Sequence, residues 1–379
     1  MTNTNKKKVP KKKVLIALSG GIDSAVSAYL LIKQGYDVEA AFMKNWTSTA
    51  GLLKNECPWL IDRQDALRVA AFLRIPLHTL DFEKQYRDRV MKYFFDEYKK
   101  GRTPNPDVMC NKEIKFKLLY DWAIKNGFDC MATGHYAQVH ESRNMKHGAE
   151  QSILHVSSFM LHRSIDEFKD QTYFIYNIKT EQLPHLVFPI GGMKKSAVRT
   201  LARKLNLPNA EKKESMGLCF VGKIRLKDFL EQKLKPKSGK IIDQDGKIIG
   251  QHPGLFNYTI GQRQGINIGA NGPYYVTKKD LKTNALYVTN DANDKSLMTK
   301  EVQIHSVNWL GELISRPADQ PASLLGRFRH QGELVPLTIG KISADNYRVI
   351  FKKSQKAIAS GQSLVIYKGK ICLGGGIIA

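Results

Sequence analysis

Residues 13–24 contain the feature that most constrains the fold, a short apolar run followed at once by a glycine-hinged loop (Lys-Val-Leu-Ile-Ala-Leu-Ser-Gly-Gly-Ile-Asp-Ser). The run has the length and β-branched content of a central strand covered on both faces. Gly20 and Gly21 let main-chain N–H groups approach an anion without a Cβ in the way. Asp23 and Ser24 suit the first turn of a following helix, where the dipole attracts phosphate. The pattern therefore predicts a strand, a phosphate-binding loop and a helix.

This loop differs from the two commonest nucleotide-binding loops. It lacks the Gly-Lys-Ser/Thr that closes a Walker A loop, and it lacks the Gly-x-Gly-x-x-Gly of dinucleotide-binding folds. Ser-Gly-Gly-x-Asp-Ser instead resembles the PP-loop of the N-type ATP pyrophosphatases, which cleave ATP between its α- and β-phosphates and leave an adenylate. An ordinary strand-turn-helix corner is the alternative, because Ser, Gly and Asp all form turns. The position of the loop directly after a strand favours the phosphate-binding interpretation.

Length and charge limit what surrounds this loop. A chain of 379 residues exceeds the size at which one core keeps growing, so we expect two or three domains. The formal net charge of +24 persists in large part without the six lysines of residues 6–13, which indicates a polyanionic partner. No apolar stretch approaches the roughly 18 residues of a membrane span, and the lysine-rich N-terminus lacks an apolar signal segment. We therefore expect a soluble, cytoplasmic protein with no membrane partner.

Cys110 lies in a segment that favours chemistry over simple packing. Two prolines just before it keep the chain extended until about Asp107, and a helix is expected to follow. Cys110 would then lie near a helix N-terminus with Lys112 and Lys115 close by, conditions that lower a thiol pKa and enrich the thiolate. Asp107 could serve there as an acid or base, although a helix N-cap fits Asp107 equally well.

Cys219 lies in an apolar cluster between Gly217 and Gly222. This pattern indicates either a loop or a short buried strand, and spacing alone slightly favours the strand. Cysteines as distant in sequence as Cys110 and Cys219 can still meet in a fold, as catalytic partners do. The chain has no Cys-x-x-Cys pair, so neither a zinc site nor a disulfide framework is indicated.

Further motifs along the chain strengthen the PP-loop interpretation and extend it. Taken together with the phosphate loop, they occur in order at residues 19–24, 42–46, 101–116, 132–136, 169–174, 217–220, 259–265, 273–276 and 361–377. With this ordered set, the chain resembles the tRNA-specific 2-thiouridylases (the MnmA/TrmU family) over almost its whole length. This family is a branch of the N-type ATP pyrophosphatases.

The resemblance implies ATP-dependent 2-thiolation of the wobble uridine in tRNAs for lysine, glutamate and glutamine. ATP would adenylate the C2 oxygen, and a persulfide sulfur would then displace AMP to give 2-thiouridine. Cys219 would accept the persulfide from a sulfur-relay or cysteine desulfurase protein. Cys110 would be its partner, either as the nucleophile on the activated base or as the resolving thiol. The resemblance also implies a transient disulfide between Cys110 and Cys219.

The resemblance also implies binding residues for each substrate. The ATP contacts would be Ala17, Leu18, Ser19, Gly20, Gly21, Ile22, Asp23, Ser24, Met43 and Gly134. The target-base segment would be Asn105, Pro106 and Asp107, with Asp107 the candidate acid/base, and the other tRNA contacts would be His135, Lys169, Asp170, Gln171, Arg327, Phe328 and Gln362. Mg²⁺ is expected with the pyrophosphate, but no carboxylate cluster identifies its ligands.

Several of these residues also have plain structural interpretations. Met43 and His135 would more often be core residues, and residues 169–171 could equally form a solvated turn. Arg327 and Arg329 surround Phe328, and strand alternation would place both arginines on one face, a combination suited to phosphate and base stacking. The family more usually has tyrosine where this chain has Phe328.

The expected fold is an α/β, doubly wound parallel-sheet PP-loop domain, then a small central domain and a C-terminal antiparallel β-barrel. The parallel strands are predicted at residues 14–18, 38–43, 77–81 and 130–133, with ATP at their carboxyl ends. Short β-rich runs mark the C-terminal third. The expected boundaries are a basic disordered tail at 1–12, the catalytic domain with its tRNA-contacting helical part at 13–228, a central tRNA-binding domain at 229–295 and the barrel at 296–379.

Two other classes of function compete with this interpretation. Another PP-loop tRNA-modifying enzyme, such as an amidating or lysidine-forming ligase, would share the loop but would not need Cys110 and Cys219. A non-catalytic basic RNA-binding protein would explain the net charge and the barrel, but it would need neither Asp23 nor ATP. The ordered set of motifs weighs against both.

Overall fold

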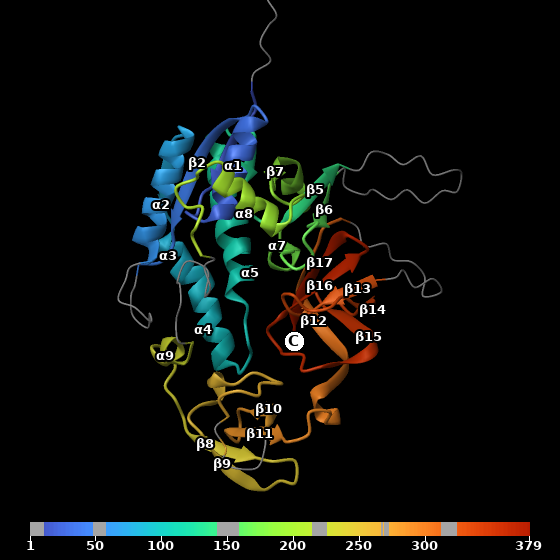
Figure 1. Cartoon of the computed structure of the whole chain (residues 1–379). Coiled ribbons are helices and arrows are strands. Elements are labelled where there is room, and N and C mark those ends of the chain that lie inside the picture. Colours follow the sequence, from blue (N-terminus) through green and yellow to red (C-terminus); the bar gives the residue numbers. More distant parts are fainter. Residues whose placement is uncertain are drawn as a thin grey trace, which may run out of the picture.

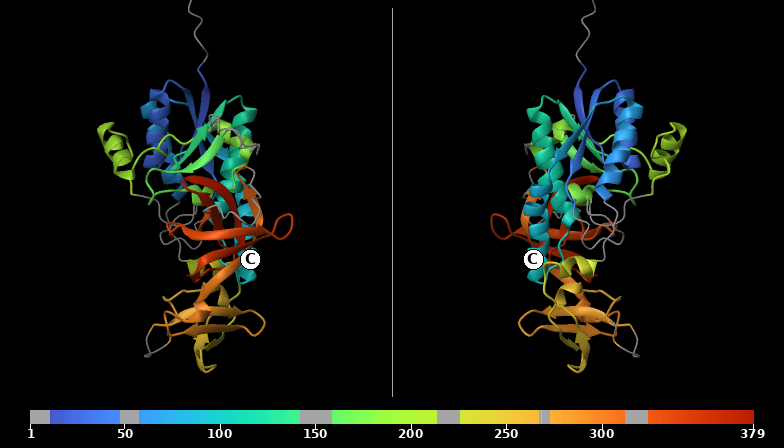
Figure 2. Two further views of the ribbon diagram at one scale, coloured as in Figure 1. Left: turned by 90° about the vertical axis from the view of Figure 1, so that its right-hand side faces the viewer. Right: turned by 90° about the vertical axis from the view of Figure 1, so that its left-hand side faces the viewer.

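The computed structural model describes residues 11–47, 58–141, 159–213, 226–266, 268, 273–311 and 324–379. Within them the chain forms three parts along a long axis (Figures 1 and 2): a parallel-sheet domain at one end, an antiparallel barrel in the middle and a four-stranded sheet at the other end. The predicted fold class is confirmed. The predicted tail at 1–12 lies almost wholly outside the described residues.

The first domain is built on a parallel sheet with the order β3-β2-β1-β4-β7. Its strands are β1 (Lys13–Ala17), β2 (Asp37–Lys44), β3 (Leu77–Asp81), β4 (Cys130–Ala132) and β7 (Leu186–Val187). The central strand β1 pairs with β2 on one side and with β4 on the other, both in parallel. The connection changes direction between these neighbours, which is where open α/β sheets bind ligands at the carboxyl ends of their strands.

Side chains of β1 alternate between two buried layers, as expected for a strand covered on both faces. Val14 and Ile16 pack with α1 (Ile22–Lys33), α2 (Pro58–Leu73) and α8 (Lys195–Lys204). Leu15 and Ala17 pack with the helices of residues 83–125 on the other face. Those helices are α3 (Glu83–Tyr86), α4 (Lys92–Lys99), α5 (Pro106–Cys110) and α6 (Tyr120–Lys125), joined by π-helical turns at Arg87–Met91 and Asn111–Leu119.

The small sheet at the far end has the order β10-β11-β8-β9, with β11 and β8 parallel and the other pairs antiparallel. Its strands are β8 (Gly239–Ile242), β9 (Ile248–His252), β10 (Tyr275–Asp280) and β11 (Ala285–Thr289). It has its own buried cluster, formed by residues such as Ile241, Val276 and Leu286. The helix α9 (Leu226–Glu231) precedes it and packs through Phe229 into the core of the first domain. Short 3₁₀ turns occur at Thr180–His185, Leu255–Asn257 and Lys295–Leu297.

The C-terminal strands form a closed antiparallel barrel, because β12 pairs with both β15 and β17. Its strands are β12 (Met298–Trp309), β13 (Leu324–Arg327), β14 (Val335–Lys341), β15 (Tyr347–Lys356), β16 (Ser363–Lys368) and β17 (Ile371–Ile378). The hairpin of β5 (Ala137–Glu141) and β6 (Phe159–Arg163) extends this sheet, since Ile371 of β17 pairs with His162. Sequence patterns did not predict that a hairpin of the first domain would join the barrel.

The barrel is fixed to the first domain by polar contacts that are buried or partly buried. Asn308 Nδ2 donates to the main-chain oxygens of Tyr176 and Ile178 at 2.8 and 2.9 Å. The amide of Thr103 donates to Ser360 O at 2.9 Å, and the hydroxyls of Tyr176 and Ser363 are 3.2 Å apart. These contacts surround the entry to α5 and the short helix α7 (Thr172–Ile175). The barrel therefore helps to position the segment that carries Cys110.

Candidate active site

The loop between β1 and α1 is shaped by its own backbone and hydroxyl groups. Gly20 has φ +75°, in the left-handed region that favours glycine, and a Cβ there would collide with the main-chain oxygen of Asp62. Ser24 Oγ donates to Gly21 O at 3.0 Å and accepts from Ser19 N at 3.2 Å. The loop thus has a fixed shape at the N-terminus of a helix, a position that favours an anion.

Asp23 is the most strongly bonded polar group of this loop. Lys195 Nζ donates to its two carboxylate oxygens at 2.7 and 2.8 Å, and Tyr136 Oη donates to Oδ1 at 2.9 Å. The Lys195 side chain is only 12% exposed, and its ammonium lies 5.8 Å from the centre of the Tyr136 ring. Lys195 was not predicted from the sequence, because no local pattern links the first residue of α8 to a carboxylate so far away along the chain.

Gly134 lies at the end of β4, against the start of α1. A Cβ at this position would lie 2.7 Å from Ser24 N, closer than real Cβ contacts come. Glycine is therefore required for the close approach of these two segments. The position agrees with a nucleotide pocket bounded by the loop and the end of β4, and contact of Gly134 with ATP stays a prediction.

Three other residues predicted to contact ATP, Leu18, Ile22 and Met43, are buried. Met43 is 5% exposed and packs in the same cluster as Ala17 and Cys110, and Leu18 is 1% exposed. Ile22 at the start of α1 is 5% exposed. The structure thus places Met43 between the sheet and the helices of residues 83–125, and its proposed contact with adenine stays a prediction.

An additional candidate lies at the carboxyl end of β2. Asn45 is 1% exposed, and among the residues that the structure describes neither its Nδ2 nor its Oδ1 has a hydrogen-bond partner. A buried amide without partners is costly, so such a group is a candidate for contact with a ligand. Asn45 was predicted only as part of the family motif at 42–46, because the orphaned amide becomes visible only in the structure.

Asn105 begins the helix that carries Cys110. Its side-chain oxygen accepts from the amides of Asp107 and Val108 at 3.1 and 3.2 Å, with Pro106 at the first helical position. The helix N-cap is therefore Asn105, so the N-cap interpretation of Asp107 is wrong. Cys110 is fully buried at the end of this first turn. Its position near a helix N-terminus, predicted from the prolines, is confirmed.

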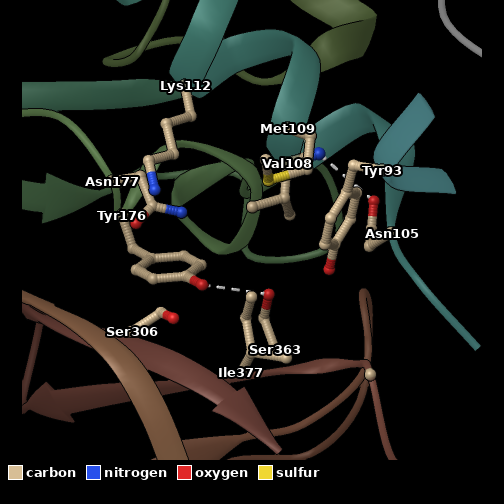
Figure 3. A pocket seen from close by; sticks show the side chains of 11 residues that line it. Tyr93, Asn105, Val108, Met109, Lys112, Tyr176, Asn177, Ser306, Ser363 and Ile377 are labelled. Carbon is tan, nitrogen blue, oxygen red and sulfur yellow. Dashed lines mark hydrogen bonds between the residues drawn. The ribbon is translucent and has the colours of Figure 1, made fainter. Parts of the chain in front are cut away.

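A pocket lies between this helix and the barrel (Figure 3). Asn105, Met109 and Lys112 line it from the helix side, and Ser306, Gly361 and Ser363 line it from the barrel side. Tyr176 reaches across and contacts the Ser363 hydroxyl. Of the predicted target-base residues, Asn105 therefore lines a small pocket that the barrel helps to enclose.

His135 is buried beside the same helix. Its Nδ1 is 2.7 Å from Thr133 Oγ1, its Nε2 is 3.5 Å from Lys115 Nζ, and its ring lies near those of Phe116 and Phe188. Burial, and after it the positive charge of Lys115, lowers the pKa of His135 well below 6.5. The ring is therefore neutral at physiological pH, and only 8% of the residue is exposed. Its predicted contact with tRNA is not visible in this geometry and stays a prediction.

Two of the predicted tRNA contacts bind each other. Arg327 donates to Asp170 Oδ2 at 2.8 Å, and the residues are 4% and 1% exposed. Asp170 also accepts from the hydroxyl of Thr172 at 2.9 and 3.0 Å. The Gln171 side chain accepts from Tyr136 N at 2.9 Å. This arrangement joins the loop at 164–171 to the barrel and to β5, and contact of Lys169, Asp170, Gln171 and Arg327 with tRNA stays a prediction.

Arg327 and Arg329 do not share a face, so that prediction is wrong. Strand β13 ends at Arg327, and strand alternation therefore does not extend to Arg329. Arg329 is exposed and donates to the main-chain oxygens of Lys356 and Ala357 at 2.7 and 2.5 Å, while Phe328 packs edge-on against Phe351. Gln362 donates to Thr103 O at 2.7 Å, next to the segment that leads to α5.

Cys219 lies outside the described residues, so its distance from Cys110 and the predicted disulfide stay undefined. Among the described ranges, no group of three or more His, Cys, Asp or Glu side chains is arranged to hold a metal ion. Mg²⁺ that accompanies a nucleotide usually takes one or two carboxylates plus the phosphates. Asp23 in the first turn of α1 fits that limited role. Where the chain is described, no helix is long and apolar enough to cross a membrane.

This combination of a parallel sheet, a Ser-Gly-Gly-x-Asp-Ser loop and appended β domains defines a PP-loop nucleotide-binding protein. Comparison with protein-family models gives matches to a tRNA methyl transferase HUP domain at 12–223, a tRNA methyl transferase PRC-barrel domain at 227–290 and an aminomethyltransferase beta-barrel domain at 299–378. The three matches follow the three parts of the structure. The family labels refer to methyl transfer, whereas the curated relatives have a different name.

Those relatives are called tRNA-specific 2-thiouridylase MnmA. The protein from Enterococcus faecalis is 42% identical over 374 residues, covering 97% of this chain and 95% of the relative. The one from Pediococcus pentosaceus is 44% identical (97% and 95% covered), and the one from Alkaliphilus oremlandii is 43% identical (98% of each). The chain belongs to the tRNA-specific 2-thiouridylase family.

Similarity to solved structures is weaker. The U34-tRNA thiolase NcsA from Methanococcus maripaludis has a TM-score of 0.35 and 19% identity, with 59% of this chain and 65% of that chain covered. The NMN synthetase from Francisella tularensis has a TM-score of 0.34 and 20% identity, with 59% and 79% covered. Structural similarities this low support no conclusion about function.

Proposed function

We propose that this protein uses ATP to convert the wobble uridine of tRNAs for lysine, glutamate and glutamine into 2-thiouridine. The C2 oxygen of the uridine attacks the α-phosphorus of ATP, and pyrophosphate leaves. The outer sulfur of a persulfide then attacks C2, and AMP leaves with the former C2 oxygen. A thiol next attacks the inner sulfur and breaks the sulfur–sulfur bond, so that one sulfur stays on the base and the two thiols are left as a disulfide. The first step needs a phosphate site, and the second needs a sulfur nucleophile close to the base.

One observation carries this proposal beyond the family name. The phosphate loop and the capped helix that ends at Cys110 belong to one domain, and Ala17 before the loop packs in the same buried cluster as Cys110. The small pocket beside Asn105 lies next to that helix and would have to widen for the base to enter. A ligase that attaches an amine or a lysine would have no use for a cysteine in this position.

The proposal assigns a role to two of the five cysteines. Cys219 carries the persulfide, and Cys110 is either the nucleophile on the activated base or the thiol that resolves the persulfide. A disulfide between Cys110 and Cys219 would form in the second case. Because Cys110 is fully buried, binding of tRNA has to open this end of the helix before the thiol can react.

The remaining assignments belong to the same proposal. ATP binds at residues 17–24, Met43 and Gly134, and Mg²⁺ binds to its phosphates. The target base is contacted by Asn105, Pro106 and Asp107, and Asp107 serves as the acid or base. The net charge of +24 suits a tRNA partner. A sulfur-relay or cysteine desulfurase protein supplies the persulfide, and the cytoplasm is the proposed compartment. The domain boundaries are those expected from the sequence.

The test is mass-spectrometric nucleoside analysis of unmodified lysine tRNA after incubation with the protein, ATP, Mg²⁺ and a persulfide donor. Wild type should form 2-thiouridine, and Cys219→Ser should form none. Cys130→Ala is the matched control, because Cys130 is buried in β4 and burial raises the pKa of its thiol, which makes it a poor nucleophile.

The other outcomes separate the competing functions. A wild-type protein that binds tRNA and consumes ATP but forms another modified nucleoside would be a different PP-loop enzyme. One that binds tRNA without consuming ATP would be an RNA-binding protein. A methylated uridine that appears only when a methyl donor is added would support the labels of the family models instead.

A further inference from the structure

The phosphate loop has no cation of its own. Residues 19–24 contain neither lysine nor arginine, whereas a Walker A loop includes the lysine that binds the phosphates. The charge comes instead from α8, where Lys195 places its ammonium 2.7 Å from Asp23 Oδ1. Its side chain is 12% exposed, so it is largely withdrawn from water but still reachable from the loop.

The pairing of Lys195 with Asp23 holds a cation beside an anion-binding loop. A triphosphate brings several negative charges to this position, and a charge-assisted bond to phosphate competes well with a bond to one carboxylate. Arrival of a nucleotide can therefore draw the ammonium from Asp23 to the phosphates. Asp23 then becomes available for the Mg²⁺ that accompanies them.

A second carboxylate positions Lys195. Asp166 Oδ2 accepts from the main-chain amide of Lys195 at 2.9 Å, and its Oδ1 accepts from the amide of Lys169 at 3.1 Å. Ser164 reinforces this link, because its hydroxyl donates to Gly191 O at 3.0 Å and accepts from Asp166 N at 3.2 Å. Asp166 therefore ties the first residue of α8 to the loop at 164–171.

The same loop reaches Asp23 by another route. The Gln171 side chain accepts from Tyr136 N at 2.9 Å, and Gln171 N donates to Tyr136 O at 2.9 Å. The hydroxyl of Tyr136 in turn donates to Asp23. Two hydrogen-bonded paths thus connect the 164–171 loop with one carboxylate of the phosphate loop.

We propose that Lys195 binds the phosphates of ATP by exchanging Asp23 for the nucleotide, and that Asp166 positions it from the loop that contacts tRNA. The inference rests on the proposed function, which assigns ATP to the phosphate loop and tRNA to residues 169–171. The ammonium has two positions, on Asp23 or on phosphate, and ATP and tRNA both bias the choice. The consequence is that binding of one substrate changes the affinity for the other.

The first test measures ATP binding by equilibrium dialysis without tRNA. Lys195→Met should weaken ATP binding about tenfold or more, since it removes a charged bond, while Lys195→Arg should retain most of the affinity. Lys194→Met is the matched control, because Lys194 is the exposed N-cap residue of α8 and its side chain makes no capping hydrogen bond. Unchanged ATP binding by Lys195→Met would overturn the proposal.

A second pair of variants covers the case in which Lys195→Met fails to fold because Asp23 is left unpaired. Asp23→Asn alone, measured without Mg²⁺, should bind ATP at least as tightly as wild type, because Lys195 no longer has a competing carboxylate. Asp23→Asn combined with Lys195→Met should bind about tenfold more weakly than Asp23→Asn. Equal affinities of these two variants would overturn the assignment of Lys195.

The link through Asp166 is tested by the ratio of ATP dissociation constants with and without saturating tRNA. Wild type should give a ratio different from one, and Asp166→Ala should bring it towards one, with partial retention in Asp166→Asn. A wild-type ratio of one, or an unchanged ratio in Asp166→Ala, would overturn the link. None of these measurements needs thiolation, so a protein that passes them but makes no 2-thiouridine refutes only the proposed function.

Discussion

Several residues that were expected to contact tRNA are buried in the structure, where they stabilise the fold. Asp170 and Arg327 were expected at a tRNA surface, but they form a buried ion pair between the first domain and the barrel. His135 was expected there too, and it is a neutral ring inside the core. If substitutions of these residues weaken tRNA binding, part of that effect should come from the loss of the architecture that the residues stabilise.

Loss of Arg327 should destabilise the whole protein. Arg327→Met leaves the buried Asp170 carboxylate without its closest cation, which should lower the free energy of unfolding by about 3–5 kcal/mol. Urea unfolding measures this change, with Arg348→Met as control, because Arg348 pairs with Glu301 on the surface and its loss should matter much less. Unchanged unfolding with weakened tRNA binding would show instead that Arg327 acts mainly on tRNA.

His135 should make the protein sensitive to mild acid. Because the folded pKa lies well below 6.5, only the unfolded chain takes up this proton as the pH falls below 6.5. That contribution is absent above pH 6.5 and destabilises the fold below it. Between pH 7.5 and 5.5, the free energy of unfolding of wild type should fall by about 1.4 kcal/mol more than that of His135→Gln. Parallel losses in urea titrations of the two proteins would contradict a neutral buried ring.

Among the structural elements, the helix that begins at Asn105 and the ends of β1 and β4 define the site. The strand, loop and helix at residues 13–24 could be predicted because each step has a local signal: an apolar run, two glycines and an N-terminal carboxylate. The same holds for the helix after the two prolines. Lys195 and Asp166 could not be predicted, because their hydrogen-bond partners lie on distant segments. Asn45 was predicted only within a family motif, and its amide without a partner among the described residues is a feature of the folded chain.

The cap at Asn105 separates stability from recognition. Asn105→Ala should cost about 1 kcal/mol of stability, since it removes the acceptor for two helix amides, whereas Asn105→Ser should retain most of the cap. Thermal unfolding and 2-thiouridine formation are measured on both variants. If the amide also reads the base, Asn105→Ser should be stable but poorly active. If Asn105→Ser is fully active, Asn105 serves only as the helix N-cap and its amide does not contact the base.

The junction of β4 with α1 should not tolerate a side chain. Gly134→Ala would place a methyl group 2.7 Å from Ser24 N, so the loop has to move and ATP affinity should fall about tenfold or more. Equilibrium dialysis measures the affinity, and circular dichroism checks the fold. Gly127→Ala is the control, because a Cβ at Gly127 would have no neighbour within 4 Å, although its φ of +77° adds some backbone strain. Wild-type ATP affinity in Gly134→Ala would place the nucleotide elsewhere.

At the scale of the whole molecule, the barrel and the α/β domain together enclose the small pocket beside Asn105. The C-terminal barrel was predictable from the change in periodicity along the chain, whereas the central domain was predicted from the family resemblance. The joining of the β5–β6 hairpin to β17 was not, because strand pairing across roughly 200 residues leaves no local pattern. The pocket beside Asn105 exists only through this docking, since residues of both parts line it. This part of the candidate site therefore forms only when the barrel docks on the first domain.

The central claim is that the wobble uridine is activated by adenylation at its C2 oxygen. We would supply a lysine tRNA with ¹⁸O at that position, together with ATP, Mg²⁺ and the persulfide donor, and analyse the nucleotide products by mass spectrometry. We predict one ¹⁸O in AMP for each 2-thiouridine formed, with unlabelled pyrophosphate. AMP without the label, or ADP and phosphate as the products of ATP, would contradict adenylation at this oxygen.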